Sequence, residues 1–410
     1  MGPLGERGGD RGGEQLGVLD GGQRGQGGQR RERGGHEAIV AAGRCGSGVH
    51  RSATDRPRAR RPRAAGAWDG WDVSQTTTLP PPVPALAPRR TPGGAGSPTV
   101  VAHRGASGHR PEHTLEAYRT AIRMGADAVE LDLVPTADGA LIVRHESELS
   151  RTTDIGARPD LAHLRRTRPV DGVPRAGWFS EDLTLAQVRT LTARERMPEL
   201  RPGNTVHDGR EGVPTLDEAL ATIHAEGVRA GRRVGVLLEL KEPARFAGRG
   251  LAVEGPLLAA LARHGLDDAA APVAVLSFEE TVLRRLALRT RVPLVRLLDV
   301  GDDAGAAALE EIASYAGGVG VHQDLVVPRA RSGRARPSVL VRDAHRRGLG
   351  VHAWTLRAEN RFLAREHRRG PHPGGLGDVA GAAGALLAAG VDGLITDHPD
   401  LVLPAVRARA

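Results

Sequence analysis

The sequence predicts an α/β fold of the (β/α)8 TIM-barrel type for the larger part of this 410-residue chain. From residue 99 onward, short and continuously apolar segments alternate with helical patterns, which indicates a parallel sheet covered by helices on both faces. Roughly eight such units extend over about 310 residues, and barrels of this type have about 250 residues plus insertions. The competing fold, a doubly wound open sheet, usually has a glycine-rich phosphate loop after its first strand. The segment HRGASG at 103–108 does not match that pattern.

Strands are expected where runs of Val, Leu, Ile and Ala are bounded by glycine, proline or polar residues. The run TVVAH at 99–103 is the first of them, and the turn Ala137-Asp138-Gly139 joins the second strand to the third. The full set of expected strands is 99–103, 128–134, 141–143, 235–240, 273–278, 294–298, 318–321, 350–355 and 393–396.

Helices are expected between these strands, where apolar residues recur at helical spacing. Thr215 is a suitable N-cap for the second helix, and Glu218, three residues later, completes a capping box. The full set of expected helices is 115–124, 215–226, 251–264, 279–288, 304–313, 338–347 and 378–389.

Residues 147–214 form a segment that is too long for an ordinary loop inside a compact domain. The segment follows the third strand and contains one helical stretch, 184–191, together with the pair Trp178 and Phe179. We therefore expect a small inserted subdomain over the C-terminal face of the barrel, where enzymes of this fold have their active sites.

The first 98 residues differ in composition from the rest of the chain. They hold 15 arginines against 9 acidic residues, with 22 of the 55 glycines and 10 of the 28 prolines. Such a segment cannot bury enough apolar surface to offset the entropy of ordering it. The predicted organisation is a disordered tail over 1–98 and a barrel domain over 99–404. The tail is either an arm for a polyanion or sequence shaped by a GC-rich genome. Aromatic residues do not interleave with its arginine clusters, so no specific nucleic acid partner is expected.

Composition excludes several classes of protein. The single cysteine, Cys45, excludes an internal disulfide framework and a multi-cysteine zinc site. There is no apolar run of about 18 residues or more, so no transmembrane segment is expected. The N-terminus also lacks the apolar core of a signal peptide. The chain as given is therefore expected in the cytoplasm, with secretion possible if the start is misassigned; the sequence leaves the oligomeric state open.

Acidic residues on apolar strands are the first candidates for chemistry. Glu130 and Asp132 alternate with Leu131, so both carboxylates point to one side of their strand. Inside a barrel they would repel each other and lose hydration, a conflict that a divalent cation removes. Glu239 offers a third oxygen ligand from another strand, and such ligands favour a hard ion, Ca²⁺ or Mg²⁺. Lys241, the only lysine of the chain, lies two residues beyond Glu239 and suits a phosphate oxygen or a leaving group. Taken alone, an E-x-D pair is also common on exposed strands.

Two histidines come next, because His103 and His145 each end a predicted strand. Neutral and charged imidazole coexist near pH 7, so such a pair can act as general base and general acid. Arg104 has the planar fork that binds phosphate. Trp354, at the end of a late strand, is a candidate aromatic wall of a substrate pocket. For each of these residues taken singly, a structural role is the alternative.

Six motifs together carry a family resemblance. They occur in the order HRGASGHRPEHT at 103–114, ELD at 130–132, RHESELSRTT at 144–153, LELK at 238–241, HAWT at 352–355 and DGLITDHPD at 392–400. Over about residues 99–404 the chain resembles the glycerophosphodiester phosphodiesterase family, in particular its bacterial, long-insertion branch.

The resemblance implies a (β/α)8 barrel that hydrolyses a small-molecule glycerophosphodiester to glycerol 3-phosphate and an alcohol with a divalent cation. It implies His103 and His145 as the catalytic pair, Glu130, Asp132 and Glu239 as metal ligands, and Arg104 and Lys241 as phosphate contacts. A cyclic phosphate intermediate is the expected route. Glu146 departs from the family, which usually has Asp after the second histidine, and Glu112 in the P-E-x-T turn is expected to have a local role.

Two other functions are compatible with the sequence. A cyclising phospholipase on the same barrel would act on intact lipids and would need an apolar surface beside the site, for which Trp178 and Phe179 are the candidates. A non-catalytic protein that binds polyanions through the arginine-rich tail would show salt-dependent binding to nucleic acid.

Overall fold

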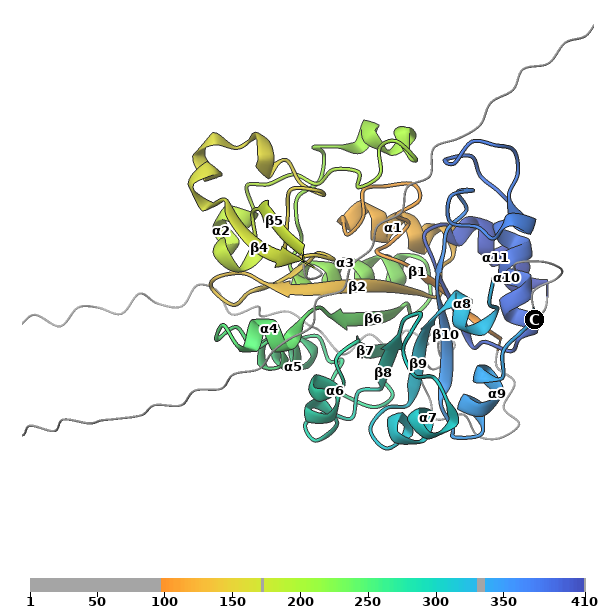
Figure 1. Cartoon of the computed structure of the whole chain (residues 1–410). Helices are drawn as coiled ribbons and strands as arrows, with labels where there is room; N and C mark the ends of the chain where they lie inside the picture. Colours follow the sequence, from red (N-terminus) through yellow and green to blue (C-terminus); the bar gives the residue numbers. More distant parts are fainter. Residues whose placement is uncertain (1–96, 171–172, 330–335, 409–410) are drawn as a thin grey trace, which may run out of the picture. The chain divides into compact units, whose positions relative to one another are not determined.

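Eight parallel strands close into a barrel in the computed structural model, which describes residues 97–170, 173–329 and 336–408. The predicted tail over 1–98 lies outside the described residues as far as residue 96. Around the barrel the strands follow the order β1, β2, β6, β7, β8, β9, β10 and β11, and β1 closes the ring by pairing with both β2 and β11. Figure 1 shows the run from β2 through β6 to β10. The fold class predicted from the sequence is therefore confirmed.

The barrel strands are short and almost entirely buried. Their bounds are β1 (Thr99–Ala102), β2 (Ala128–Pro135), β6 (Gly235–Leu240), β7 (Val273–Ser277), β8 (Leu294–Leu298), β9 (Gly318–His322), β10 (Gly350–Leu356) and β11 (Gly393–Thr396). The helices outside them are α1 (Leu115–Met124), α3 (Leu216–Arg229), α5 (Glu254–Arg263), α6 (Glu280–Ala287), α7 (Ala306–Ala313), α9 (Leu340–His345), α10 (Val379–Ala388) and α11 (Pro399–Arg407). Two further short helices, α4 (Pro243–Ala247) and α8 (Gln323–Val326), follow β6 and β9 directly.

Alternation along the strands separates the apolar residues inside the barrel from those that pack against the helices. Val101, Ala128, Leu237 and Ile395 belong to a small cluster contributed by inward-facing barrel positions. Their strand neighbours, such as Leu131, belong to the larger cluster that packs the barrel against its helices. Because side chains alternate between faces, Glu130 and Asp132 share the inward face with Ala128, and Glu239 shares it with Leu237.

The strand predicted at 141–143 exists, but it does not belong to the barrel. This strand, β3 (Leu141–Val143), pairs antiparallel with the end of β2, with Val143 opposite Leu133. The turn between β2 and β3 is only a few residues long, and a parallel connection needs a crossover of a dozen or more. His145 therefore follows a hairpin strand at the rim of the barrel and not one of the eight parallel strands. The hairpin nevertheless carries the chain back to β2, where the Arg144 amide donates to the Asp132 carbonyl at 3.0 Å.

Several helices differ from their predicted bounds. The capping box at Thr215 and Glu218 is present at the start of α3. Helix α5 begins at Glu254 rather than 251, and α9 is shorter at both ends than 338–347. Helix α11 was not predicted from the sequence and extends past residue 404, the expected limit of the domain.

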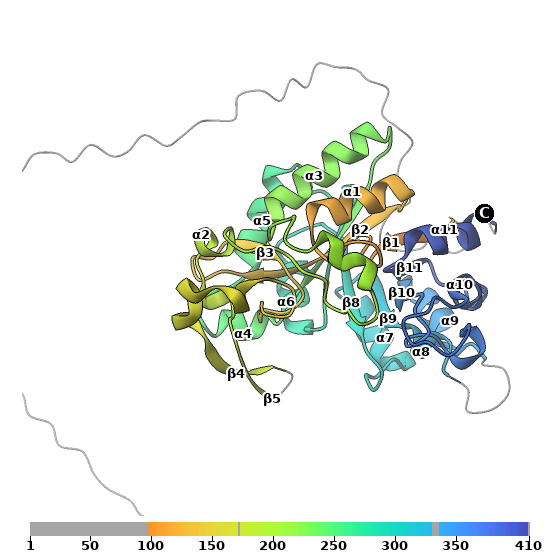
Figure 2. The ribbon, with the colours of Figure 1, turned by 90° about the horizontal axis from the view of Figure 1, so that it is seen from above.

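The inserted segment folds into a hairpin, short helical turns and loops. Its hairpin consists of β4 (Arg166–Val170) and β5 (Val173–Gly177) and projects away from the barrel (Figure 2). The predicted helix at 184–191 is shorter, α2 (Leu185–Val188). Phe179 is buried, so it offers no exposed apolar surface. Within the described ranges, no helix has both the length and the apolar character needed to span a bilayer.

Candidate active site

Three acidic side chains meet inside the barrel at the carboxyl ends of β2 and β6. The two strands are neighbours, and Asp132 lies directly opposite Glu239 in their register. Glu130, Asp132 and Glu239 are all buried, and each offers a carboxylate oxygen within 4.8 Å of the others. Neighbouring parallel strands thus bring together residues that are more than 100 positions apart in the chain.

The electrostatics of this cluster fit a cation. Oε1 of Glu130 is buried and has no hydrogen-bond partner in the described part of the chain. Burial, followed by the charges of Asp132 and Glu239, raises the pKa of Glu130 well above its usual value. Burial also raises the pKa of Glu239, to about 7, against the opposing effect of Lys241. A divalent cation would balance these carboxylates, and an all-oxygen donor set suits Ca²⁺ or Mg²⁺.

Two cationic side chains border the carboxylates. Nζ of Lys241 lies 2.5 Å from Oε1 of Glu239 and 3.3 Å from Oδ1 of Asp132. Nε of Arg104 lies 3.1 Å from Oδ2 of Asp132. Although burial alone would raise the pKa of Asp132, Lys241 and other nearby cationic groups hold it well below its usual range. Asp132 is therefore ionised, and the two phosphate contacts expected from the sequence lie beside it.

The turn after β1 owes its shape to two residues in the left-handed region. Arg104 has φ 59° and Gly105 has φ 82°, and a Cβ on Gly105 would lie 2.7 Å from the backbone of Ala117. Only glycine tolerates that approach, while Arg104 adopts a conformation that costs on the order of 1 kcal/mol or more. The turn aims the Arg104 amide at Oε2 of Glu130, at 2.9 Å.

His103 is held by an aspartate at the end of the last barrel strand. Its Nδ1 lies 2.6 Å from Oδ1 of Asp397, and the ring is mostly buried. Burial, followed by the charge of Arg104, lowers the pKa of His103 to about 4, although Asp397 opposes the shift. Because an ionised carboxylate can only accept, Nδ1 carries the proton of the neutral ring and Nε2 keeps its lone pair.

His145 lies beside Glu146, the glutamate that departs from the family pattern, at ion-pair distance but without the hydrogen-bond geometry that joins His103 to Asp397. Nδ1 of His145 lies 2.9 Å from Oε1 of Glu146. Burial, then the charges of Arg104 and Lys241, lowers the pKa of His145 to about 3. The longer glutamate side chain therefore still reaches the imidazole.

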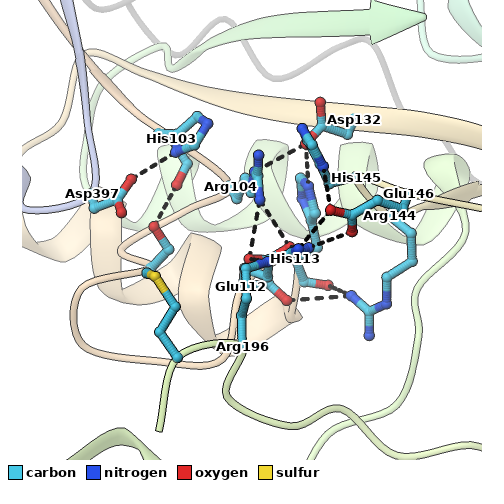
Figure 3. Close-up of polar contacts among 12 residues, drawn as sticks. His103, Arg104, Glu112, His113, Asp132, Arg144, His145, Glu146, Arg196 and Asp397 are labelled. Carbon is cyan, nitrogen blue, oxygen red and sulfur yellow. Dashed lines mark hydrogen bonds and ion pairs between the residues drawn. The ribbon is translucent and has the colours of Figure 1, made fainter. Parts of the chain in front are cut away.

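Arginines and carboxylates beyond these residues complete the site (Figure 3). Arg196, from the inserted segment, donates to both oxygens of Glu112 and both oxygens of Glu146 at 2.5–2.7 Å. Glu112 also accepts from Arg104 at 3.1 Å, so its role extends beyond the local turn expected from the sequence. The backbone of His113 also lies in the left-handed region, with φ 55°. Nε2 of His113 is 2.9 Å from Oδ2 of Asp132.

Trp354 lies at one side of this site, in contact with other aromatic rings. Its ring is 5.7 Å from that of Phe278 and 5.2 Å from that of His322, both in edge-to-face orientation. Phe278 in turn lies 5.9 Å from Nζ of Lys241. Trp354 is thus connected to the site through Phe278, a half-exposed side chain that sequence reasoning missed.

The residues selected from the sequence therefore gather at one end of the barrel, and their main supports were not selected. Asp397 stands in the DGLITDHPD motif, which was a usable signal. No sequence signal singled out Arg196, because the chain has 56 arginines and nothing in its neighbourhood distinguishes this one.

Residues 103–401 match the glycerophosphoryl diester phosphodiesterase family. A glycerophosphodiester phosphodiesterase of Bacillus subtilis is 33% identical over 310 residues, covering 74% of this chain and 84% of the relative. A glycerophosphodiester phosphodiesterase of Arabidopsis thaliana is 31% identical over 299 residues, covering 67% of this chain and 78% of the relative.

A phosphodiesterase of Oleispira antarctica, in complex with the product sn-glycerol-3-phosphate, superposes with a TM-score of 0.52 at 22% identity. The match covers 76% of this chain and 97% of that protein. At that identity the likeness supports a common fold.

Proposed function

The chain belongs to the glycerophosphoryl diester phosphodiesterase family, and from this premise we propose that it is a metal-dependent enzyme that hydrolyses glycerophosphodiesters to glycerol 3-phosphate and an alcohol. One observation carries the proposal: three buried carboxylates, two cationic side chains and two carboxylate-bound imidazoles gather at one end of the barrel. Glu130, Asp132 and Glu239 would hold the cation, which when bound supplies positive charge to the phosphoryl oxygens and lowers the pKa of the nucleophile.

Different side chains of the site would bind the phosphate and the remainder of the substrate. Arg104 and Lys241 neutralise the phosphate diester, Arg104 with its planar fork and Lys241 as a compact charge. Trp354 and Phe278 offer apolar surface to the part of the substrate that carries no phosphate. Burial strengthens these electrostatic interactions because water does not screen them.

The two histidines move protons. Both rings are neutral before substrate binds, since burial lowers the pKa of each. Either can therefore accept the proton of the glycerol 2-hydroxyl through Nε2. The oxygen of that hydroxyl attacks phosphorus, the bond to the alcohol breaks, and the second imidazole, protonated in the presence of the anionic phosphate, donates its proton to the departing oxygen. Water then opens the cyclic phosphate, and the two histidines exchange roles.

Substrates without the neighbouring hydroxyl are expected to be poor. In the proposed route the nucleophile is tethered to the reacting phosphorus, and such intramolecular attack gains greatly from proximity. We expect a 2-deoxy analogue of glycerophosphocholine to be turned over at least about 1,000-fold more slowly than glycerophosphocholine itself. Steady-state rates on the two compounds measure this. Comparable turnover would show that water attacks directly.

Release of glycerol 3-phosphate by purified protein tests the proposal itself. We expect release from glycerophosphocholine and glycerophosphoethanolamine in the presence of Ca²⁺ or Mg²⁺, its loss on chelation with EDTA, and its return when the ion is restored. An enzyme-coupled assay for glycerol 3-phosphate follows the reaction. Intact phospholipid serves as the comparison, because preferential cleavage of lipid would favour a phospholipase. Turnover that persists undiminished in EDTA would exclude a metal-dependent mechanism.

A further inference from the structure

Two largely buried arginines of the inserted segment contact the end of the barrel where the site lies. Arg196 and Arg201 both belong to the loop that follows α2, and their side chains are 10% and 6% exposed. Charged side chains in the insertion could instead face solvent, and most of its other arginines do. Each of these two binds two carboxylates of the barrel loops, and Arg201 also binds a backbone carbonyl, so their burial needs a physical reason.

Arg196 connects the insertion to His145. Its guanidinium donates two hydrogen bonds to Glu146, whose Oε1 lies 2.9 Å from Nδ1 of His145. Its remaining contacts are with Glu112, which also binds the side chain of Arg104. Arg196 therefore fixes the carboxylate that faces one imidazole and the carboxylate that faces a phosphate contact (Figure 3).

Arg201 connects the same loop to His103. Nη2 of Arg201 donates to Oδ2 of Asp397 at 2.5 Å, and the other oxygen of Asp397 contacts Nδ1 of His103. The Nε of Arg201 donates to the buried Glu359, and its Nη1 donates to the carbonyl of Ser107 at 2.8 Å. The hydroxyl of Ser107 in turn donates to the carbonyl of His103. Nε of Arg357 donates to the same Oδ2 of Asp397 at 2.8 Å. Arg201 therefore holds Asp397 together with Arg357, and it also contacts the backbone turn that follows His103.

The two chains of contact have the same form. In each, an arginine of the insertion binds a carboxylate, and the carboxylate faces Nδ1 of a histidine, which leaves Nε2 for the reaction. A guanidinium has donors in a rigid fork and can bind two carboxylates at once, whereas an ammonium is a point charge without that geometry. A carboxylate held in this way sets both the tautomer and the orientation of the imidazole.

We propose that Arg196 and Arg201 are positioning residues, through which the inserted segment orients both histidines of the proposed phosphodiesterase site. The inference rests on the proposed function for its catalytic meaning, and it assigns the insertion a structural part in the active site itself. It also explains how Glu146 can take the place of the usual aspartate beside His145. Arg196 donates to both carboxylate oxygens of Glu146 and so holds the longer side chain near the imidazole.

Lysine substitutions in the full-length protein test the proposal, since they keep the charge and remove the fork. We expect R196K and R201K each to lower kcat about 10- to 100-fold with little change in KM. Arg168→Lys is the matched control: Arg168 lies in the same insertion and donates to both oxygens of Asp182. Asp182 makes no recorded contact with a histidine in the described residues, so R168K should leave kcat unchanged.

A measurement that does not need turnover accompanies the kinetics. Ring ¹⁵N signals of His103 and His145 report the tautomer of each imidazole. We expect both rings of the unaltered protein to carry the proton on Nδ1, R201K to change the signals of His103, and R196K to change those of His145. R168K should change neither set.

The outcomes separate this inference from the proposed function. Lower kcat together with the matching change in ring signals supports the positioning role. Unchanged kcat, or lower kcat with unchanged ring signals, overturns it. If the unaltered protein hydrolyses no glycerophosphodiester, the proposed function fails while the ring signals still decide the positioning role. Should a lysine variant fail to fold, as thermal unfolding would reveal, E146Q and D397N make the same test from the carboxylate side.

Discussion

Glutamine at position 239 is expected to abolish phosphodiesterase activity, lowering kcat by about 1,000-fold or more. The substitution preserves the size of the side chain and removes one of three carboxylates that would hold the cation, whose charge stabilisation is worth several kcal/mol in such sites. Calorimetric titration with Ca²⁺ should show weaker binding to E239Q. An excess of ion should restore activity only in part, because the substitution also removes the negative charge that pairs with Lys241. Nζ of Lys241 lies 2.5 Å from Oε1 of Glu239.

The matched control for this variant is Glu254→Gln. Glu254 is as buried as Glu239, but it pairs with Arg285 on the outside of the barrel. E254Q should lose some stability and keep its activity and its affinity for the ion. If E239Q retained turnover within about tenfold of the unaltered protein, Glu239 could not be an essential ligand.

Replacement of His103 by glutamine is the second large effect that we expect, with kcat falling about 100- to 10,000-fold. Glutamine can still donate to Asp397, so the local fold should persist, but it cannot take up or release a proton. Affinity for the ion should be unchanged, since His103 makes no recorded contact with the three carboxylates. This combination of normal ion binding and lost turnover distinguishes a proton-transfer role from a structural one.

His345→Gln is the corresponding control. His345, on α9 outside the barrel, also pairs with an aspartate: its Nε2 lies 2.8 Å from Oδ2 of Asp392. H345Q should therefore show kcat close to that of the unaltered protein. Equal losses in H103Q and H345Q would indicate that both act through stability, and the general acid–base assignment of His103 would have to be abandoned.

The fold and the position of the acidic cluster could be predicted from the amino-acid sequence. Alternation along an apolar strand puts Glu130 and Asp132 on the side opposite Leu131, and the same rule applies to Glu239 two residues before Lys241. These are short-range rules that need only the strand to exist. In a closed parallel barrel, residues near the carboxyl ends of strands then share one face, so the placement of His103, Arg104 and Lys241 follows from strand order.

The residues that hold these groups in place could not be predicted from the sequence, because their contacts arise from the packing of distant segments. The antiparallel pairing of β3, the reach of Asp397 to His103, and the entry of Arg196 and Arg201 all depend on how loops return to the barrel end. An arginine of the insertion lies some 50 to 200 positions from its partners, and nothing local distinguishes it from an exposed one. Local periodicity specifies the direction of a side chain within its own element, whereas the partner it meets is set by packing between elements that are distant in the chain.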